Sequence, residues 1–87
     1  MGKMIIHHLV RDYEAWRPAY DRHEAMRNAA GLTNGRDFRL AENSNDLLIL
    51  LDMADRQRAD EFAASADLKS VMQDAGVLGR PELYYVE

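Results

Sequence analysis

Two stretches of the chain are apolar at nearly every position, a pattern typical of strands that are covered on both faces of a sheet. They span residues 4–10 and residues 46–53. A third stretch, residues 36–42, alternates between apolar and polar positions, which indicates a half-exposed strand at a sheet edge. A fourth strand is expected over residues 82–87, directly after Pro81. The pattern therefore predicts four strands.

The segment between the first two strands carries apolar residues at helical spacing as far as Ala30. Asp12 is a suitable N-cap, and Gly31 is a natural residue to follow the last helical turn. Pro18 removes a backbone donor, and its ring clashes with the carbonyl four residues earlier. We therefore expect either a short turn over residues 12–17 followed by a helix that starts at Pro18, or one kinked helix.

Turn residues and two further helical segments complete the pattern. Residues 34–35, Asn-Gly, are expected to form a turn before the second strand, and residues 43–45, Asn-Ser-Asn, a hairpin turn after it. Residues 55–64 have one apolar helical face, and Ser65 can cap another helix that ends at Gly76. The predicted element order is βαββαβ.

This order predicts an α+β fold of the ferredoxin-like type, a four-stranded antiparallel sheet with its helices on one face. The first and third strands are then central, and these are the two strands that are apolar on both faces. The helices leave one apolar sheet face uncovered, and such a patch usually marks an interface. We expect a homodimer that forms through the open sheet face, the alternative being a monomer with an exposed apolar face. Residues 1–87 are expected to form one domain.

Composition narrows the classes of function. The 87 residues include no cysteine, which excludes disulfides and fits a reducing, cytoplasmic location. The net charge of −4 argues against a nucleic-acid partner, because phosphate binding needs a clustered basic surface. No apolar run approaches the roughly 20 residues that span a membrane, and the N-terminal apolar run is too short for a signal peptide. We expect neither a membrane nor a nucleic-acid partner.

One face of the first helical region carries side chains with an apolar body and a polar tip. They are Tyr13, Trp16, Tyr20, His23 and Arg27. A face that serves packing alone favours Leu, Ile and Val, whereas this set suits a cavity that orients a small molecule through a few polar groups. The alternative is that these side chains lie at the helix edge with their tips in water.

Two histidines are candidate catalytic residues. If His8 on the first strand faces the helices, it can meet His23, and a buried imidazole can act as a general base near neutral pH. The alternative for His8 is a core histidine bonded to the backbone. His7 points the opposite way, toward the expected dimer face. We expect no metal, because Asp21 and Glu24 do not share a helical face and no ligand motif is present.

The chain resembles a family of small, mostly uncharacterised bacterial proteins. The resemblance rests on residues 8–16, His-Leu-Val-Arg-Asp-Tyr-Glu-Ala-Trp, and on residues 20–23, Tyr-Asp-Arg-His. It continues through residues 65–77 and through Arg-Pro-Glu at residues 80–82. These proteins are similar to the dimeric α+β barrel superfamily, which includes antibiotic-biosynthesis-monooxygenase-like domains, and some are labelled "cyclase". The resemblance implies the fold and the dimer more specifically than an activity.

The resemblance and the residues together suggest a small monooxygenase-like enzyme that needs no cofactor and acts on an aromatic or polyketide-like molecule. His8 or His23 would be the base, Arg27 would hold an anionic group, and Trp16 and Tyr20 would form walls. A non-catalytic module that binds a small ligand needs the same cavity without the base. A purely structural dimer is the third reading, and it requires the helix face to pack without a cavity.

Overall fold

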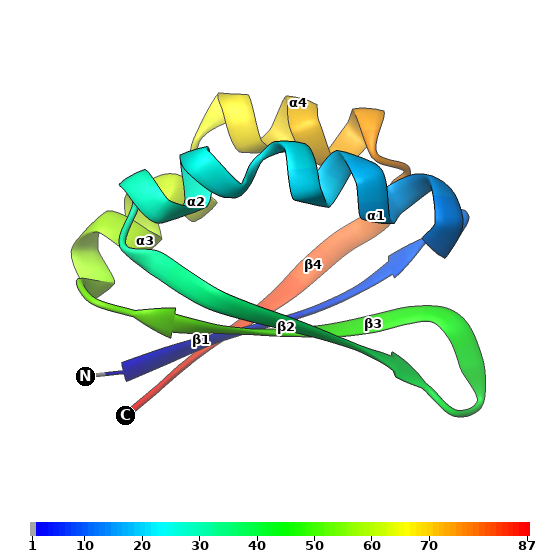
Figure 1. The fold of residues 1–87 in the computed structure, drawn as a ribbon, viewed down its shortest axis with the longest axis horizontal. Helices are drawn as coiled ribbons and strands as arrows, with labels where there is room; N and C mark the ends of the chain where they lie inside the picture. The colour runs from blue at the N-terminus through cyan, green and yellow to red at the C-terminus, as the bar shows by residue number, and fades with distance from the viewer. Residues whose placement is uncertain (1) are drawn as a thin grey trace.

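A pair of short helices precedes and another pair follows the central β-hairpin in the computed structural model, which describes residues 2–87 (Figure 1). In chain order the elements are β1 (Gly2–Val10), α1 (Tyr13–Arg22), α2 (Glu24–Ala29), β2 (Leu32–Leu40), β3 (Asn43–Met53), α3 (Arg56–Ala63), α4 (Ala66–Asp74) and β4 (Val77–Val86). The strands form one antiparallel sheet in the order β2-β3-β1-β4. All the helices lie on one face of this sheet. The predicted βαββαβ fold is confirmed, with β1 and β3 central.

The strands are longer than the sequence pattern indicates. Asn34 and Gly35 do not form a turn before β2 but an irregularity within it, where the register with β3 shifts. β2 starts early because Leu32 is fully buried and anchors the chain directly after the helix. The hairpin turn is residues 41–42 rather than 43–45. Pro81 lies inside β4 instead of opening it, which an edge strand tolerates because one side of its backbone needs no ladder bonds.

The first helical region breaks at His23 and not at Pro18. α1 runs through Pro18, whose side chain faces solvent. The predicted caps are confirmed: Asp12 accepts a hydrogen bond from the Glu14 amide, and Ser65 accepts one from the Leu68 amide, each at 3.1 Å. Gly31 and Gly76 follow α2 and α4 with φ of +79° and +85°, a region that favours glycine.

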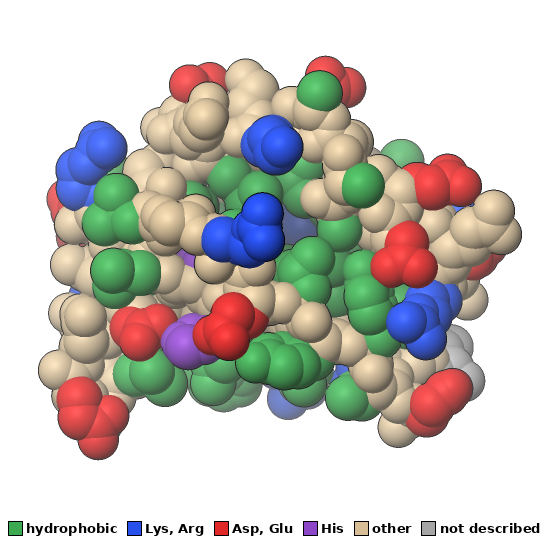
Figure 2. Space-filling view, turned by 180° about the vertical axis from the view of Figure 1, so that it is seen from behind, with side chains coloured by type: hydrophobic (Ala, Val, Ile, Leu, Met, Phe, Trp, Pro, Cys, Tyr) green, Lys and Arg blue, Asp and Glu red, His purple; other side chains and the backbone are tan. Residues whose placement is uncertain are grey.

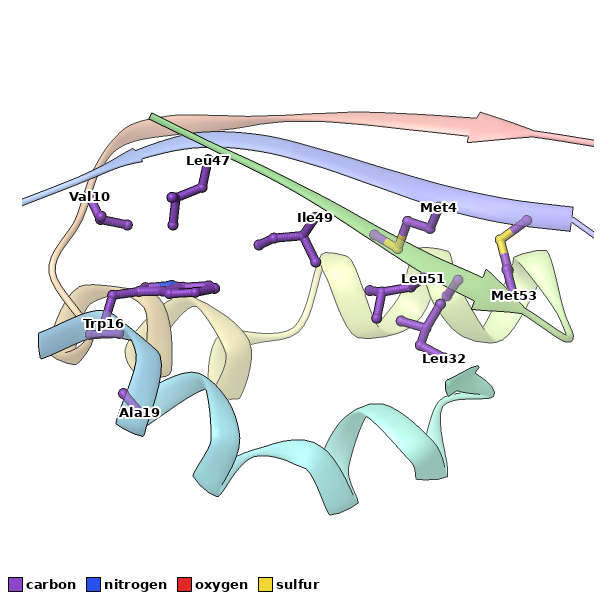
Figure 3. Close-up of a cluster of buried hydrophobic side chains, with 11 residues drawn as sticks. Met4, Val10, Trp16, Ala19, Leu32, Leu47, Ile49, Leu51 and Met53 are labelled. Carbon is purple, nitrogen blue, oxygen red and sulfur yellow. The ribbon is translucent and has the colours of Figure 1, made fainter. Parts of the chain in front are cut away.

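The core lies between the sheet and α1. Helix-facing side chains of the two central strands alternate with open-face ones, so that Met4, Leu47, Ile49 and Leu51 are each no more than 1% exposed. Trp16 lies beneath the sheet, and the side chains of Val10, Leu47 and Ile49 point from the sheet toward its ring (Figure 3). This core positions the sheet-facing side of α1 against the middle of β1 and β3.

The other face of the sheet has no covering helix. Its exposed apolar side chains come from the outer strands and the end of β1, and they are Leu9, Phe38, Leu78, Tyr84 and Val86, between 39% and 51% exposed. Strand register places Phe38 beside Leu48 and Tyr84 beside Ile5 on this face. The open apolar face expected from the sequence is therefore present in this chain.

Candidate functional site

A cavity of about 650 Å³ lies between the covered face of the sheet and the helices. We call it the helix-side cavity. Its walls come from β1, β3 and β4, from α1 and α2 on one side, and from the end of α3 and α4 on the other. Figure 2 shows this side of the molecule hollowed near its centre, with apolar side chains inside and Lys or Arg side chains at the rim. A volume of this size is within the range of small-molecule sites.

Three of the four predicted binding residues line the helix-side cavity, namely Trp16, Tyr20 and Arg27. Both candidate catalytic residues, His8 and His23, line it as well. Tyr13 is not among the lining residues. Its hydroxyl donates a 2.7 Å hydrogen bond to Asp37 on β2, and Arg17 also donates to that carboxylate. Tyr13 therefore ties α1 to the sheet beside the site.

The side chains of Arg27, Tyr20, Trp16 and His8 form a continuous row along the wall of the cavity. The guanidinium carbon of Arg27 lies 3.6 Å from the centre of the Tyr20 ring. The Tyr20 and Trp16 rings stack with centroids 4.7 Å apart, and the His8 ring meets Trp16 edge-on at 5.7 Å. The result is a wall with the charge of Arg27 at one end and the imidazole of His8 at the other.

The break between α1 and α2 positions His23 and Arg27. In a continuous helix the Ala19 carbonyl would accept from the amide of residue 23. Here the His23 amide donates to the Tyr20 carbonyl instead, at 3.2 Å. The Ala19 carbonyl accepts a hydrogen bond from the ring Nδ1 of His23 at 2.8 Å. Arg27 Nη1 donates to the Tyr20 carbonyl at 2.6 Å. Two candidate site residues thus satisfy the carbonyls that the break releases.

The bonding of His23 fixes which ring nitrogen carries the proton. A carbonyl oxygen can only accept, so Nδ1 of His23 must be the donor to Ala19. In the neutral ring Nε2 then keeps its lone pair and is an acceptor or base. Because the ring lines the helix-side cavity, this nitrogen is a candidate for the base that removes a proton from a bound molecule.

His8 differs from His23 in its surroundings. It is 6% exposed, and within residues 2–87 its Nδ1 is a buried atom without a hydrogen-bond partner. Burial lowers the pKa of His8 below the ordinary value of 6.5, because charging the ring there is costly. His8 is therefore a neutral group at pH 7, and its ring lines the helix-side cavity.

The far wall of the cavity was not predicted from the sequence. It is built by apolar side chains of α4 and β4, among them Leu68, Met72 and Leu83. None of the residues of α4 is fully buried, because its apolar face meets the cavity and not a packed core. Lys69 and Arg80 lie on this wall as well. The exposure of Leu83, 38% for an apolar residue on the helix side, reflects the same opening.

His7 lies on the open sheet face, as predicted. Its ring is held between two carboxylates, with Nδ1 2.7 Å from Glu82 and Nε2 2.7 Å from Asp46. The bond to Glu82, and then the bond to Asp46, raises the pKa of His7 above 6.5. Across residues 2–87 no cluster of three metal-ligating side chains is found, and no helix there is long and apolar enough to cross a membrane.

Comparison with known proteins supports the fold more than a function. No protein-family model and no curated protein matches the chain. The fold is that of antibiotic biosynthesis monooxygenase-like structures. One is a Bordetella bronchiseptica protein provisionally assigned to that activity, with a TM-score of 0.78 and 14% identity over 99% of this chain and 94% of that one. Another is SnoaB of Streptomyces nogalater, described as a cofactor-independent oxygenase, with a TM-score of 0.70 and 12% identity over 99% and 90%. Identity this low defines a shared fold alone.

Proposed function

We propose that the protein is a small cofactor-independent oxygenase that acts on an aromatic or polyketide-like molecule in the helix-side cavity. The observation that carries the proposal is that two imidazoles and a buried guanidinium line one apolar cavity. The fold shared with SnoaB, described as an oxygenase without a cofactor, adds support.

The chemistry requires a substrate with an acidic C–H bond next to a carbonyl or an electron-rich ring. Removal of the proton leaves a carbanion, which gives electrons to dioxygen and forms a carbon–oxygen bond. The resulting peroxide then loses water, so that a CH₂ group and O₂ become C=O and H₂O. Dioxygen accepts all four electrons, and no external reductant is needed. The protein has only to move a proton, stabilise an anion and exclude water.

His23 is the base in this proposal, and its Nε2 takes the proton. It is half-buried, so its imidazolium form keeps contact with water, and the Ala19 carbonyl continues to hold Nδ1–H. His8 donates to or accepts from the substrate oxygen while remaining neutral. Arg27 stabilises negative charge on the substrate. Trp16 and Tyr20 form the wall against which the ring of the substrate lies.

The test is dioxygen uptake with product analysis, using aromatic ketones with an acidic methylene group, anthrone first. Replacing His23 with Gln should lower kcat about 100-fold or more, because a positioned base contributes about 10²–10⁴. Arg22→Gln, an exposed change on the same helix, is the matched control. Unchanged uptake in H23Q would contradict the assignment of the base.

The same assay decides between the enzyme and a module that only binds. In the double variant H8Q/H23Q, loss of turnover with retained affinity supports the enzyme. Absence of turnover in the native protein across the panel, with measurable binding, supports a binding module and contradicts the enzyme.

We also propose that the protein is a cytoplasmic homodimer that forms through the open sheet face. Several charged groups on that face are already paired, since His7 bonds to Asp46 and Glu82, and Lys3 bonds to Asp52 at 2.5 Å. The face can thus be buried without stranding these charges. A sedimentation mass near the 10.0 kDa of one chain at micromolar concentration would contradict the dimer.

A further inference from the structure

Charge is distributed unevenly between the protein and its cavity. The chain has 15 acidic and 11 basic residues, yet the lining of the helix-side cavity includes no Asp or Glu. It includes three cationic residues, Arg27, Lys69 and Arg80. An acidic protein that lines this apolar cavity with positive charge favours a negative occupant.

Arg27 is the most informative of the three. It is 9% exposed, and within residues 2–87 no carboxylate oxygen lies within 4.0 Å of its nitrogens. Asp21 and Glu24 share a second, smaller pocket of about 70 Å³ with Arg27, but neither carboxylate is within ion-pair distance of its guanidinium. A buried cation normally has a counter-ion, because desolvation without one is costly. Within the described chain this guanidinium therefore has no direct ion pair, and an anion in the helix-side cavity could supply one.

Part of Arg27 is free to bind. One nitrogen, Nη1, donates to the Tyr20 carbonyl. The other guanidinium nitrogens are not among the buried atoms that lack partners, so they are accessible from the hollows that Arg27 lines. A planar guanidinium with accessible N–H groups suits a carboxylate or a similar oxyanion.

The wall between Arg27 and His8 indicates the size of the occupant. The rings of Tyr20 and Trp16 separate the two polar groups. A molecule that bonds to both must therefore extend past two aromatic side chains. Its body must also be apolar, because the facing wall consists of residues such as Leu68, Met72 and Leu83.

We infer that the cavity takes an organic anion with an extended aromatic body, whose negative group binds Arg27 and whose opposite end reaches His8. Lys69 and Arg80 lie at exposed positions on the far wall and attract the anion toward the opening. The inference deepens the proposed function and rests on it for the location of the site. It names the class of substrate, an ionised aromatic acid or phenolate.

The experiment compares two ligands that differ only in charge, 2-naphthoate and 2-naphthamide, by calorimetric titration at pH 7.5. The native protein should bind the acid roughly tenfold or more tightly than the amide, since a charge-assisted pair is about twice as strong as a neutral one. Arg27→Gln should remove this preference and leave the affinity for the amide unchanged. Arg22→Gln should keep the preference.

Two further variants keep the inference testable if Arg27→Gln fails to fold. Lys69→Gln and Arg80→Gln lie at exposed positions, and each should lower the affinity for naphthoate severalfold without affecting naphthamide. Equal binding of acid and amide by the native protein, or failure to bind the acid, would overturn the inference. Because neither probe needs to react, that result would leave the oxygen-uptake test of the proposed function standing.

Discussion

Gly35 and Tyr20 make a close contact that a single methyl group should disrupt. A Cβ atom at Gly35 would lie 2.5 Å from the Tyr20 hydroxyl oxygen and 3.0 Å from Cδ2 of Leu51. Both distances are too short, and the hydroxyl lies in a buried position where it cannot simply swing into water. Gly35→Ala must therefore displace Tyr20 from the wall of the cavity.

The expected net loss of stability in Gly35→Ala is about 1–2 kcal/mol. Overpacking of a well-packed site costs about 1–3 kcal/mol. Replacing glycine with alanine also reduces the conformational freedom of the unfolded chain, and this offsets the loss by about 0.4–1 kcal/mol. For a domain of this size, 1 kcal/mol corresponds to a change in Tm of roughly 4–8 °C.

Tyr20→Phe should rescue the alanine variant. The Tyr20 hydroxyl has no hydrogen-bond partner within residues 2–87, so its removal should leave stability unchanged or raise it by up to about 1 kcal/mol. It also removes the nearest clashing atom, because the ring carbon behind it lies 3.7 Å from the added methyl group. The double variant should therefore recover at least half of the loss, a coupling of roughly 1 kcal/mol.

Urea unfolding, followed by circular dichroism at a fixed protein concentration, measures all four members of this cycle. The concentration must be fixed because a dimer gains stability by mass action. A Gly35→Ala protein as stable as the native one, or a double variant no better than the alanine variant alone, would refute the packing of Tyr20 against Gly35.

The remaining predictions concern pH and assembly. Burial lowers the pKa of His8, so below about pH 6.5 the unfolded chain binds a proton at this residue more readily than the folded chain, and the native protein loses stability. His8→Gln should make this loss smaller. His7→Gln should act at the other end of the range, because the bond to Glu82 raises the pKa of His7 and its stabilisation is lost as pH rises through that value. Urea unfolding between pH 5 and 9 checks both predictions. Identical profiles of stability against pH for the two variants would contradict the opposite pKa directions given to His7 and His8. Phe38→Lys should weaken the proposed dimer in sedimentation, whereas Gln57→Lys at an exposed position of α3 should not.

The fold could be predicted because its signals are local. Apolar residues on both faces of two strands indicate that these strands are central in the sheet. Asp12 and Ser65 are residue types that favour the N-cap of a helix, and both cap helices. The exact ends of β2 and β4 could not be predicted, because the burial of Leu32 and the edge position of Pro81 depend on tertiary contacts.

The site could be predicted only on its helical side. Trp16 and its neighbours at helical spacing marked one wall, but Tyr13 is drawn away by Asp37, a strand residue distant in sequence. Lys69 and Arg80 carried no signal, because isolated charged residues are most often solvated. Only the packing of α4 and β4 places them at the cavity.

The indole N–H of Trp16 gives the most direct test that the helix-side cavity is the functional site. Trp16 is the only tryptophan of the chain and lines that cavity, so its indole signal is unique in an NMR spectrum of ¹⁵N-labelled protein. Titration with 2-naphthoate should shift this signal in a saturable manner, and Arg27→Gln should need a clearly higher ligand concentration for the same shift. A fixed indole signal, together with shifts confined to open-face residues such as Leu48 and Tyr84, would contradict the account.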